Sequence, residues 1–293
     1  MILKDFFQDY YRLSLQVIKS VFICKDIFNF QECMSMNKII YKQVLVEVTR
    51  RCNMLCPHCM RGDAQNIDAD LEIVDKFVSN FKNGFIYEVV LGGGEPSLNP
   101  EAIKFTIDTF KKYNITVRYF TMISNGRNFS DEVIEVINRV PNFAVVISFD
   151  KYHDSLTDKD YKQLNKLKCD VETKFENATD DTLLNMGKAK ENGIGVQMHD
   201  DVGLILSSYH NNLVCISPII CTCVGDILRS CDYCYDDDDL LCELRLCDYD
   251  DNLNDIIQEG AEYYRIYNLE EIPVHGKILY KFFDFLNKKG IQL

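Results

Sequence analysis

The chain has 293 residues, of which 47% are hydrophobic, and it carries a formal net charge of -13. A chain of this length buries a substantial core, either as one large α/β domain or as one domain with a small appendage. The negative net charge argues against strong sequence-independent binding of nucleic acid, because such binding needs Lys and Arg to neutralise phosphates. It suits a basic peptide or another cationic partner better.

The number of cysteines indicates the cellular compartment in which we expect the protein. The chain has 13 cysteines, and an odd number without a secretory signal argues against a disulfide framework. Charged residues interrupt the apolar N-terminal region, so no stretch reaches the ~20 apolar residues of a membrane span. We therefore expect a protein of the reducing cytoplasm, without membrane-spanning segments, in which an oxygen-sensitive centre survives.

The first 200 residues carry alternating signals for strands and helices. Residues 1–36 are predicted to form a helical extension, followed by a core over 37–205. Helices with apolar faces separate the predicted strands, and Ser130 and Gly193 are predicted to cap one helix and to end another. Strands are predicted over residues 43–49, 87–91, 117–123, 143–149, 170–175 and 195–199. About six such β-α units in succession imply parallel strands with right-handed crossovers.

The pattern changes over residues 206–293, which we expect to form a smaller cysteine-rich α+β extension. A short strand is predicted over 213–217, a hairpin from Gly225, and two closing helices over 252–268 and 274–290. The acidic run Asp236–Asp239 is predicted to be a solvated loop. Cysteines crowd into this extension, at Cys215, Cys221, Cys223, Cys231, Cys234, Cys242 and Cys247.

Three cysteines near the start of the core carry the most specific signal. Cys52, Cys56 and Cys59 form a C-x3-C-x2-C run, and Gly93-Gly94-Glu95-Pro96 follows after the next predicted strand. Thiolates at this spacing can converge on one soft metal centre, and three of them leave one iron of a four-iron cluster without a protein ligand. The run alone also fits three zinc ligands or a C-x-x-C redox pair, and the glycines alone fit a tight turn.

Together, the cysteine run and the G-G-E-P segment resemble the radical S-adenosylmethionine (radical SAM) family, over roughly residues 43–200. The resemblance implies a partial (β/α)6 TIM-like barrel that is open on one side. It also implies that Cys52, Cys56 and Cys59 hold a [4Fe-4S] cluster whose fourth iron binds the amino and carboxylate groups of SAM. An external one-electron donor such as flavodoxin or ferredoxin then supports reductive cleavage of SAM. The resulting 5′-deoxyadenosyl radical abstracts hydrogen from a substrate.

The resemblance also implies a set of SAM contacts. The segment Gly93, Gly94, Glu95 and Pro96 matches the part that binds the methionyl amine, and a carboxylate suits an ammonium group. His58 takes the place of an aromatic residue near the adenine. Ser124 and Asn125 match ribose contacts at a strand end, and Ser148 and Asp150 match ribose or substrate contacts, with ordinary loop capping as the alternative. His153 and His199 are candidate catalytic residues on the substrate side, although a lone His is more often structural.

Some radical SAM enzymes, often those that modify peptides, carry a cysteine-rich extension of the SPASM or twitch type that binds a second Fe–S cluster. Cys221, Cys223, Cys231 and Cys234 are the candidate ligands here, against the alternative of unligated thiols that pack as small hydrophobes. Three functions remain open at this point. They are a radical SAM enzyme acting on a peptide or protein, one acting on a nucleotide or cofactor precursor, and a non-catalytic zinc or iron–sulfur binding module.

Overall fold

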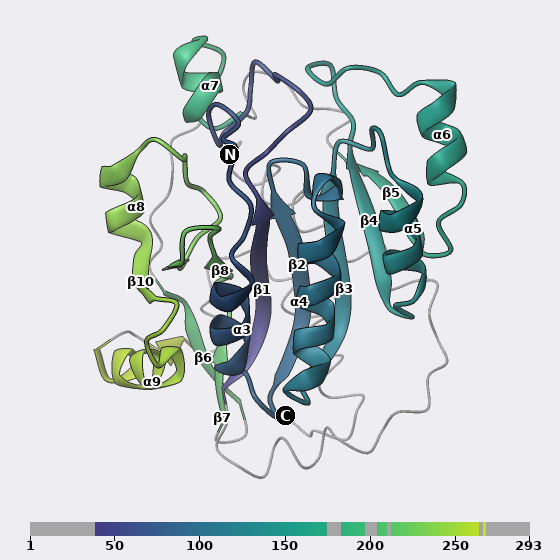
Figure 1. Cartoon of the computed structure of the whole chain (residues 1–293). Coiled ribbons are helices and arrows are strands. Elements are labelled where there is room, and N and C mark those ends of the chain that lie inside the picture. The colour runs from purple at the N-terminus through teal and green to yellow at the C-terminus, as the bar shows by residue number, and fades with distance from the viewer. Residues whose placement is uncertain (1–38, 175–182, 197–203, 210–211, 264–265, 268–293) are drawn as a thin grey trace.

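A computed structural model describes residues 39–174, 183–196, 204–209, 212–263 and 266–267 of the chain (Figure 1). Within these ranges the strands form one eleven-stranded sheet, whose main path runs β10-β9-β8-β1-β2-β3-β4-β5. The predicted helical extension over residues 1–36 and the closing helix over 274–290 lie outside the described residues.

Five neighbouring parallel strands form the centre of the sheet, as the β-α alternation predicts. They are β1 (Ile40–Thr49), β2 (Phe85–Gly93), β3 (Thr116–Ser124), β4 (Phe143–Ser148) and β5 (Asp170–Lys174), and each pairs with the next in parallel register. Every residue of β1 is buried, because a strand in the middle of a parallel sheet is covered on both faces. The carboxyl ends of these strands therefore meet along one edge.

Helices cover the outer face of these strands (Figure 1). They are α3 (Leu71–Ser79), α4 (Pro100–Lys112), α5 (Asp131–Asn138) and α6 (Asp158–Leu164). Their apolar stripes pack on the sheet in the largest hydrophobic cluster, through residues such as Phe77, Ile107 and Ile137. Ser130 caps α5 as predicted, since its side chain accepts a hydrogen bond from the backbone N–H of Val133 at 3.2 Å.

The C-terminal part extends the same sheet beyond β1. Strand β8 (Ile219–Cys221) pairs in parallel with β1 and forms an antiparallel hairpin with β9 (Asp226–Leu228), as predicted. The other elements are α7 (Gly187–Glu191), β6 (Leu206–Tyr209), β7 (Asn212–Cys215), α8 (Asp238–Leu244), β10 (Arg245–Asp248), α9 (Leu253–Tyr263), β11 (Ile266–Tyr267) and the 3-10 turn η2 (Pro96–Leu98).

Three local predictions are wrong. The closing helix predicted over 252–268 is shorter, because α9 ends at Tyr263 and Ile266–Tyr267 form strand β11. The run Asp236–Asp239 is not simply a solvated loop, because α8 begins at Asp238 and the Asp237 side chain caps it by accepting from the Leu240 N–H at 3.1 Å. Acidic residues suit this place, since the helix N-terminus carries partial positive charge. Gly195 and Val196, at the start of the predicted sixth strand, lie outside any strand, and residues 197–199 lie outside the described ranges.

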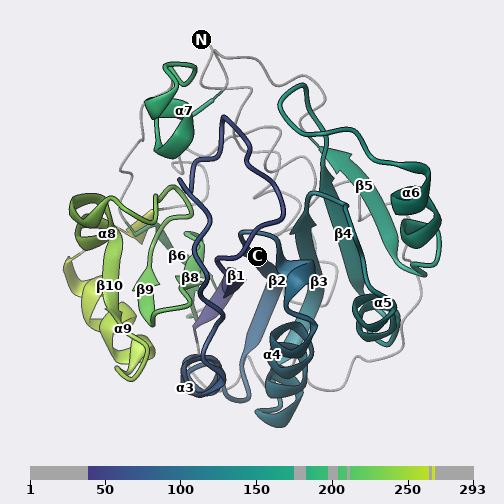
Figure 2. The same ribbon diagram turned by 45° about the horizontal axis from the view of Figure 1, so that its top comes forward.

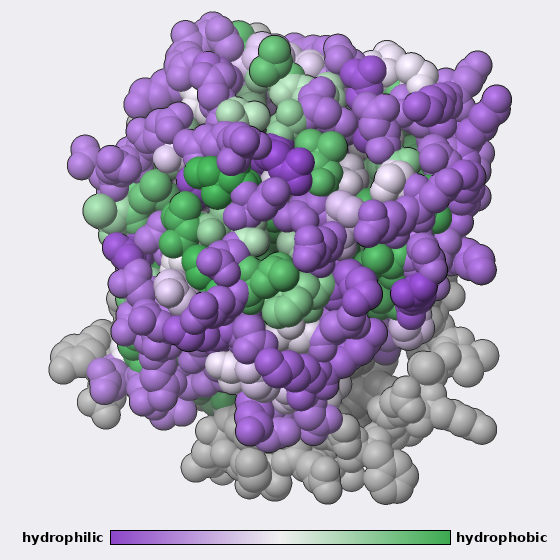
Figure 3. Space-filling view, in the orientation of Figure 1, coloured by the Kyte–Doolittle hydropathy of each residue, from purple (hydrophilic) through white to green (hydrophobic). Residues whose placement is uncertain are grey.

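Seen from the edge where the carboxyl ends meet, the strands fan out in an open arc with α3, α4 and α5 on its outer side (Figure 2). This arrangement confirms the parallel α/β sheet and the cysteine-rich antiparallel extension. The helical face shown in Figure 3 is mostly hydrophilic, with hydrophobic side chains dispersed in small groups. In the described residues, no helix combines the length and apolarity that crossing a membrane requires.

Asp160 tests the hydrogen bonds at the start of α6. Its buried carboxylate accepts hydrogen bonds from the Asn128 N–H at 3.0 Å and from the Thr157 N–H and hydroxyl at 2.9 and 2.6 Å. Burial alone raises the pKa of Asp160, but these hydrogen bonds outweigh it and lower the pKa below its ordinary value of 3.8. The ionised carboxylate therefore stabilises the fold.

We expect Asp160→Asn to lower the free energy of unfolding at neutral pH by about 1–2 kcal/mol. The difference from the parent should persist above pH 4 and shrink below it, because the parent carboxyl then takes up a proton. Urea unfolding at several pH values measures this, with Asp158→Asn in the exposed first turn of the same helix as control. A difference that stays constant down to pH 2.5 contradicts the assignment.

Candidate functional site

The candidate site lies where the carboxyl ends of β1 to β4 meet, the edge at which parallel α/β folds place their active sites. Residues 50–70 form an irregular loop that connects β1 to α3 and carries the three cysteines, and we call it the cysteine loop. The G-G-E-P segment begins at Gly93, the last residue of β2, while Ser124 ends β3, Asn125 follows it, and Asp150 follows β4. The fold therefore brings these sequence-predicted segments to one edge.

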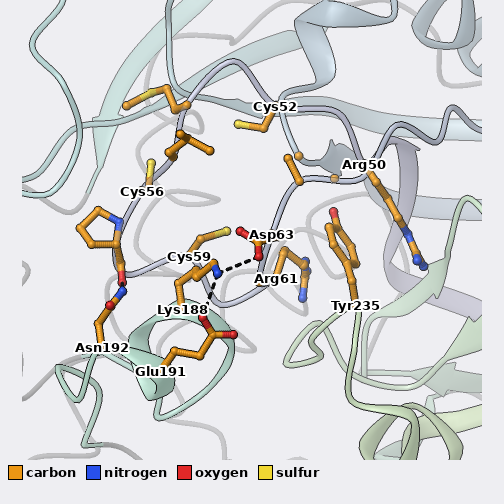
Figure 4. Close-up of a pocket in the computed structure, with 17 residues that line it drawn as sticks. Arg50, Cys52, Cys56, Cys59, Arg61, Asp63, Lys188, Glu191, Asn192 and Tyr235 are labelled. Carbon is orange, nitrogen blue, oxygen red and sulfur yellow. Dashed lines mark hydrogen bonds and ion pairs between the residues drawn. The ribbon is translucent and has the colours of Figure 1, made fainter.

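The three cysteines line one pocket with a volume of about 330 Å³, together with Gly93 and Gly94. Figure 4 shows the sulfur atoms of Cys52, Cys56 and Cys59 arranged around the same open space. All three are partly exposed and none forms a disulfide. A Cys56–Cys59 turn, closed by a hydrogen bond from the Cys59 N–H to the Cys56 carbonyl at 3.2 Å, sets the spacing of the last two.

The electrostatics of this pocket disfavour three free thiolates. Burial raises the pKa of each thiol above its ordinary value of 9.0, and for Cys56 to about 12, where the neighbouring sulfurs Cys59 and Cys52 add to the effect. The metal-free thiols are therefore protonated at neutral pH. A soft cation bound between them must displace the protons, as thiolate–metal sites do.

Helix α7 holds the far end of the cysteine loop. The Lys188 N–H donates to the Cys59 carbonyl at 2.8 Å, and the Asn192 side-chain amide donates to the Pro57 carbonyl at 2.8 Å. Gly187 has a φ of 52°, and a Cβ there would lie 2.6 Å from the Cys59 oxygen. The Lys188 ammonium also bridges Asp63 and Glu191, at 2.8 Å from each (Figure 4).

The glycines after β2 allow the strand end to pack on the backbone of the cysteine loop. Gly93 has a φ of 129°, and a Cβ on it would lie 2.1 Å from the Thr49 oxygen. A Cβ on Gly94 would lie 2.3 Å from the Arg51 oxygen. No other residue type fits at such distances, so both glycines place pocket-lining backbone directly against the segment that carries Cys52.

Glu95 is fully buried and points into the protein. Its carboxylate accepts hydrogen bonds from the Ser97 N–H at 3.0 Å, the Ser124 hydroxyl at 2.8 Å and the Asn125 N–H at 2.8 Å. Burial raises the pKa of Glu95 while these hydrogen bonds counter the shift. The carboxylate thus joins the ends of β2 and β3, and it presents no exposed surface to a ligand amine.

Asn125 connects the end of β3 to the cysteine loop. Its side-chain amide donates to the Asn53 side-chain oxygen at 2.7 Å, and its own oxygen accepts from the Arg127 N–H at 3.0 Å. Asn53 stands directly after Cys52 in the sequence. Asn125 therefore positions the first cysteine through its neighbour.

His58, Asp150 and His153 form a compact cluster beside the cysteines. The Asp150 Oδ2 lies 2.8 Å from His153 Nδ1 and 3.7 Å from His58 Nε2, and Asp150 Oδ1 accepts from the Tyr152 and His153 N–H groups. Burial lowers the pKa of His58 to about 4, so this ring is neutral at pH 7. Ser148 ends β4 before the cluster, and His199 lies outside the described residues.

Residues of the C-terminal part reach the pocket, and the sequence patterns did not identify them. Tyr235 lines the pocket, and its N–H donates to the Arg61 carbonyl at 3.0 Å. Arg61 donates to the carbonyls of Cys231 and Tyr233 at 2.7 and 2.6 Å, and its guanidinium carbon lies 3.6 Å from the centre of the Tyr233 ring. The arginines that flank the cysteine run were a visible signal, but nothing in the sequence singled out Tyr235.

Three of the four candidate ligands of a second cluster donate hydrogen bonds to different backbone carbonyls. The Cys223 thiol donates to the Glu47 carbonyl at 3.2 Å, the Cys234 thiol to the Arg61 carbonyl at 3.5 Å, and the Cys221 thiol to the Thr222 carbonyl at 3.7 Å. Among the described residues, the one group of three metal-ligating side chains whose ligand atoms lie within 4.8 Å of one another is His58, Asp150 and His153. Cys52, Cys56 and Cys59 do not form such a group either, so this distance does not test a cluster, and the second cluster at Cys221, Cys223, Cys231 and Cys234 stays a prediction.

Comparison with protein families gives one match, in which the model of the radical SAM superfamily covers residues 46–205, more than half of the chain. The comparison with curated proteins found no significant match.

Solved structures show more distant similarity. anSMEcpe with bound AdoMet is 13% identical at a TM-score of 0.49, covering 74% of this chain and 80% of that chain. BtrN in complex with AdoMet and 2-DOIA is 14% identical at a TM-score of 0.43, covering 85% and 88%. Streptococcus suis SuiB bound to precursor peptide SuiA is 10% identical at a TM-score of 0.45, covering 89% and 81%.

Glu95 offers a test of the site's construction. We expect Glu95→Gln to destabilise the ligand-free protein by about 1–3 kcal/mol, because an amide N–H2 cannot accept from the Asn125 N–H and leaves that buried donor unpaired. Thermal unfolding measures the loss, with Glu101→Gln in the exposed first turn of α4 as control. An unchanged melting temperature would mean that the carboxylate is not the connection between β2 and β3.

Proposed function

Because this chain belongs to the radical SAM superfamily, we propose that Cys52, Cys56 and Cys59 are the ligands of its [4Fe-4S] cluster and that the adjoining pocket binds SAM. The observation that carries the proposal is the convergence of three non-disulfide cysteines on one pocket at the carboxyl edge of the parallel strands. The enzyme class and both cofactors follow from the family.

The donor set fits this cofactor. Thiolates are the ligands that iron–sulfur clusters take, and three leave one iron open to a small molecule. The backbone of Gly93 and Gly94, which lack side chains, forms part of the same wall. Since the Glu95 carboxylate is buried, we propose that this segment meets the methionyl amine of SAM through its backbone carbonyls, with Glu95 and Pro96 holding its shape.

The adenosine part of SAM would lie toward the ends of β3 and β4. We propose His58, stacked on Tyr152 with 4.8 Å between ring centres, as the aromatic contact, and Asp150 as its anchor. Ser124 and Asn125 act by positioning the cysteine loop and Glu95, because their side chains already bond to protein partners. Ser148 and His153 line the approach from β4.

When bound and reduced by an external one-electron donor, the cluster supplies the electron that cleaves SAM and begins hydrogen abstraction. The chain's own residues hold and orient the two cofactors and keep solvent from them. We propose a flavodoxin or ferredoxin as the donor. Leu55 is 90% exposed at the turn between Cys52 and Cys56, which places an apolar side chain where a small redox protein would approach the cluster.

For the substrate we propose a peptide or protein segment with basic residues. The net charge of -13 supports a cationic partner. Asp63 and Glu191 line the pocket with side chains 67% and 60% exposed, and since both pair with Lys188, the three side chains leave one net negative charge there. The cysteine-rich extension gives further support, since such extensions occur in peptide-modifying members of the family.

The cluster assignment is tested by the triple variant Cys52→Ala, Cys56→Ala, Cys59→Ala. We expect it to lose essentially all iron after anaerobic reconstitution and to form no 5′-deoxyadenosine, because the thiols of Cys221, Cys223 and Cys234 already donate hydrogen bonds to backbone carbonyls. Iron and sulfide analysis with absorption spectroscopy measures this, and Cys242→Ala, at an exposed cysteine of α8, should keep the parental iron content. Retention of about four irons in the triple variant would instead reveal a second cluster, which usually takes four Cys ligands.

The substrate class is tested by 5′-deoxyadenosine formation with SAM, a reductant and candidate substrates. We expect stimulation by a basic peptide, with a KM that rises with ionic strength because salt screens attraction between exposed charges. An acidic peptide of equal length serves as the control. Stimulation by nucleosides or a cofactor precursor, with none by any peptide, contradicts the peptide proposal and leaves the cluster assignment intact.

A further inference from the structure

The hydroxyl of Tyr235 is buried at the cysteine pocket without a hydrogen-bond partner among the described residues. The residue as a whole is 5% exposed. Figure 4 shows the ring rising from the C-terminal part beside Arg61, with its hydroxyl oxygen at the end nearest the cysteine loop. Buried polar groups nearly always have partners, so a buried hydroxyl without one, on a residue that lines a pocket, calls for an explanation.

The ring is held firmly in this orientation. The Arg50 guanidinium carbon lies 4.5 Å from the centre of the Tyr235 ring, a cation–π distance. Arg50 is itself fixed, because its Nε donates to Glu47 at 3.0 Å and its Nη1 donates to Gln65 at 3.0 Å. With the Tyr235 N–H bonded to the Arg61 carbonyl, both ends of the residue are anchored. The ring is therefore held in one orientation, with its buried hydroxyl on the side of the cysteine loop.

The surroundings select the kind of group that this hydroxyl meets. Burial raises the pKa of Tyr235, so the phenol stays neutral and keeps a proton to donate. Arg50, which is buried, and Arg61, which is partly buried, line the same pocket as cations, and they favour a negatively charged acceptor. Gly93 and Gly94, proposed above to meet the amine of SAM, share this wall. An amino-acid carboxylate satisfies all of these conditions.

We propose that the Tyr235 hydroxyl donates a hydrogen bond to the methionyl carboxylate of SAM, so that the C-terminal extension completes the cofactor site. This inference rests on the proposed function, because it takes the cysteine pocket as the place where SAM binds. A carboxylate has two oxygens, so one remains available to a protein donor when the other binds a metal. Tyr235 then binds the cofactor in addition to packing in the protein core.

The test compares the affinity of anaerobically reconstituted parent and Tyr235→Phe protein for two ligands by calorimetry. The ligands are SAM and decarboxylated SAM, which lacks only the carboxylate. We expect the variant to bind SAM about tenfold more weakly, the effect of losing a hydrogen bond to a charged group. Affinity for decarboxylated SAM should stay within twofold of the parent, and the iron content should not change.

Tyr233→Phe provides the matched control. The Tyr233 hydroxyl donates to the buried Glu47 carboxylate at 2.9 Å, so its removal leaves a buried acceptor unpaired and should lower the melting temperature of the ligand-free protein. Tyr235→Phe removes a hydroxyl without a protein partner, so its melting temperature should equal or exceed that of the parent. The two tyrosines thus separate a structural role from a ligand-binding role.

Three results overturn the inference. They are equal SAM affinity in parent and Tyr235→Phe, an equal loss of affinity for both ligands, and a loss of ligand-free stability as large as that of Tyr233→Phe. Failure of the proposed function gives a different result, because the reconstituted parent would then bind neither iron nor SAM, and the assignment of Tyr235 would fall with it.

Discussion

The close packing of the β2 end on the cysteine loop is the constraint on which the site depends. The Gly94 N–H donates to the Thr49 carbonyl and the Glu95 N–H to the Arg51 carbonyl, each at 2.8 Å. Only glycine allows this approach at residues 93 and 94. Within the cysteine loop, backbone bonds from the Arg50 N–H to the Ile67 carbonyl and from the Gln65 N–H to the Arg50 carbonyl close the base, so neighbouring elements must fix the part that carries the cysteines. The side chains of Asn125 and Asn192 donate further hydrogen bonds to the cysteine loop. Together these contacts set the arrangement of the three cysteines.

A second buried carboxylate joins the site to the C-terminal part. Glu47 is fully buried on β1 and accepts from Arg50 Nε at 3.0 Å, the Cys223 N–H at 2.8 Å and the Tyr233 hydroxyl at 2.9 Å. Burying a charge is costly unless it is paired and fully hydrogen-bonded. The bonds from Cys223 and Tyr233 form only when the C-terminal part lies against β1, so full pairing of this carboxylate ties the extension to the pocket.

The sequence predicts the central architecture because its signals are local. Apolar runs, helical stripes and the Ser130 cap depend on neighbours within a few residues, and they locate β1 to β5 and α3 to α5 closely. Helix α6 was missed since only Asp160 and Leu164 of its residues are buried, which leaves no apolar stripe, although Thr157 and Asp160 form a capping box. The sequence also did not predict that the Glu95 carboxylate is buried and bonded within the protein, because its partners Ser124 and Asn125 come close to it only in the folded sheet.

The sequence patterns did not predict the contacts between the cysteine loop and the C-terminal part, because these contacts join residues that lie far apart in the chain. Arg61 and its acceptor Cys231 are 170 residues apart in the sequence. Folding brings the cations Arg50 and Arg61 beneath the pocket, while the carboxylates of Asp63 and Glu191 stay near its exposed rim. In a chain with a net charge of -13, this separation of charge favours negative ligands inside the pocket and cationic partners outside it. Burial raises the pKa of Cys59, and Arg61 offsets part of this rise, which eases the loss of the proton that metal binding requires.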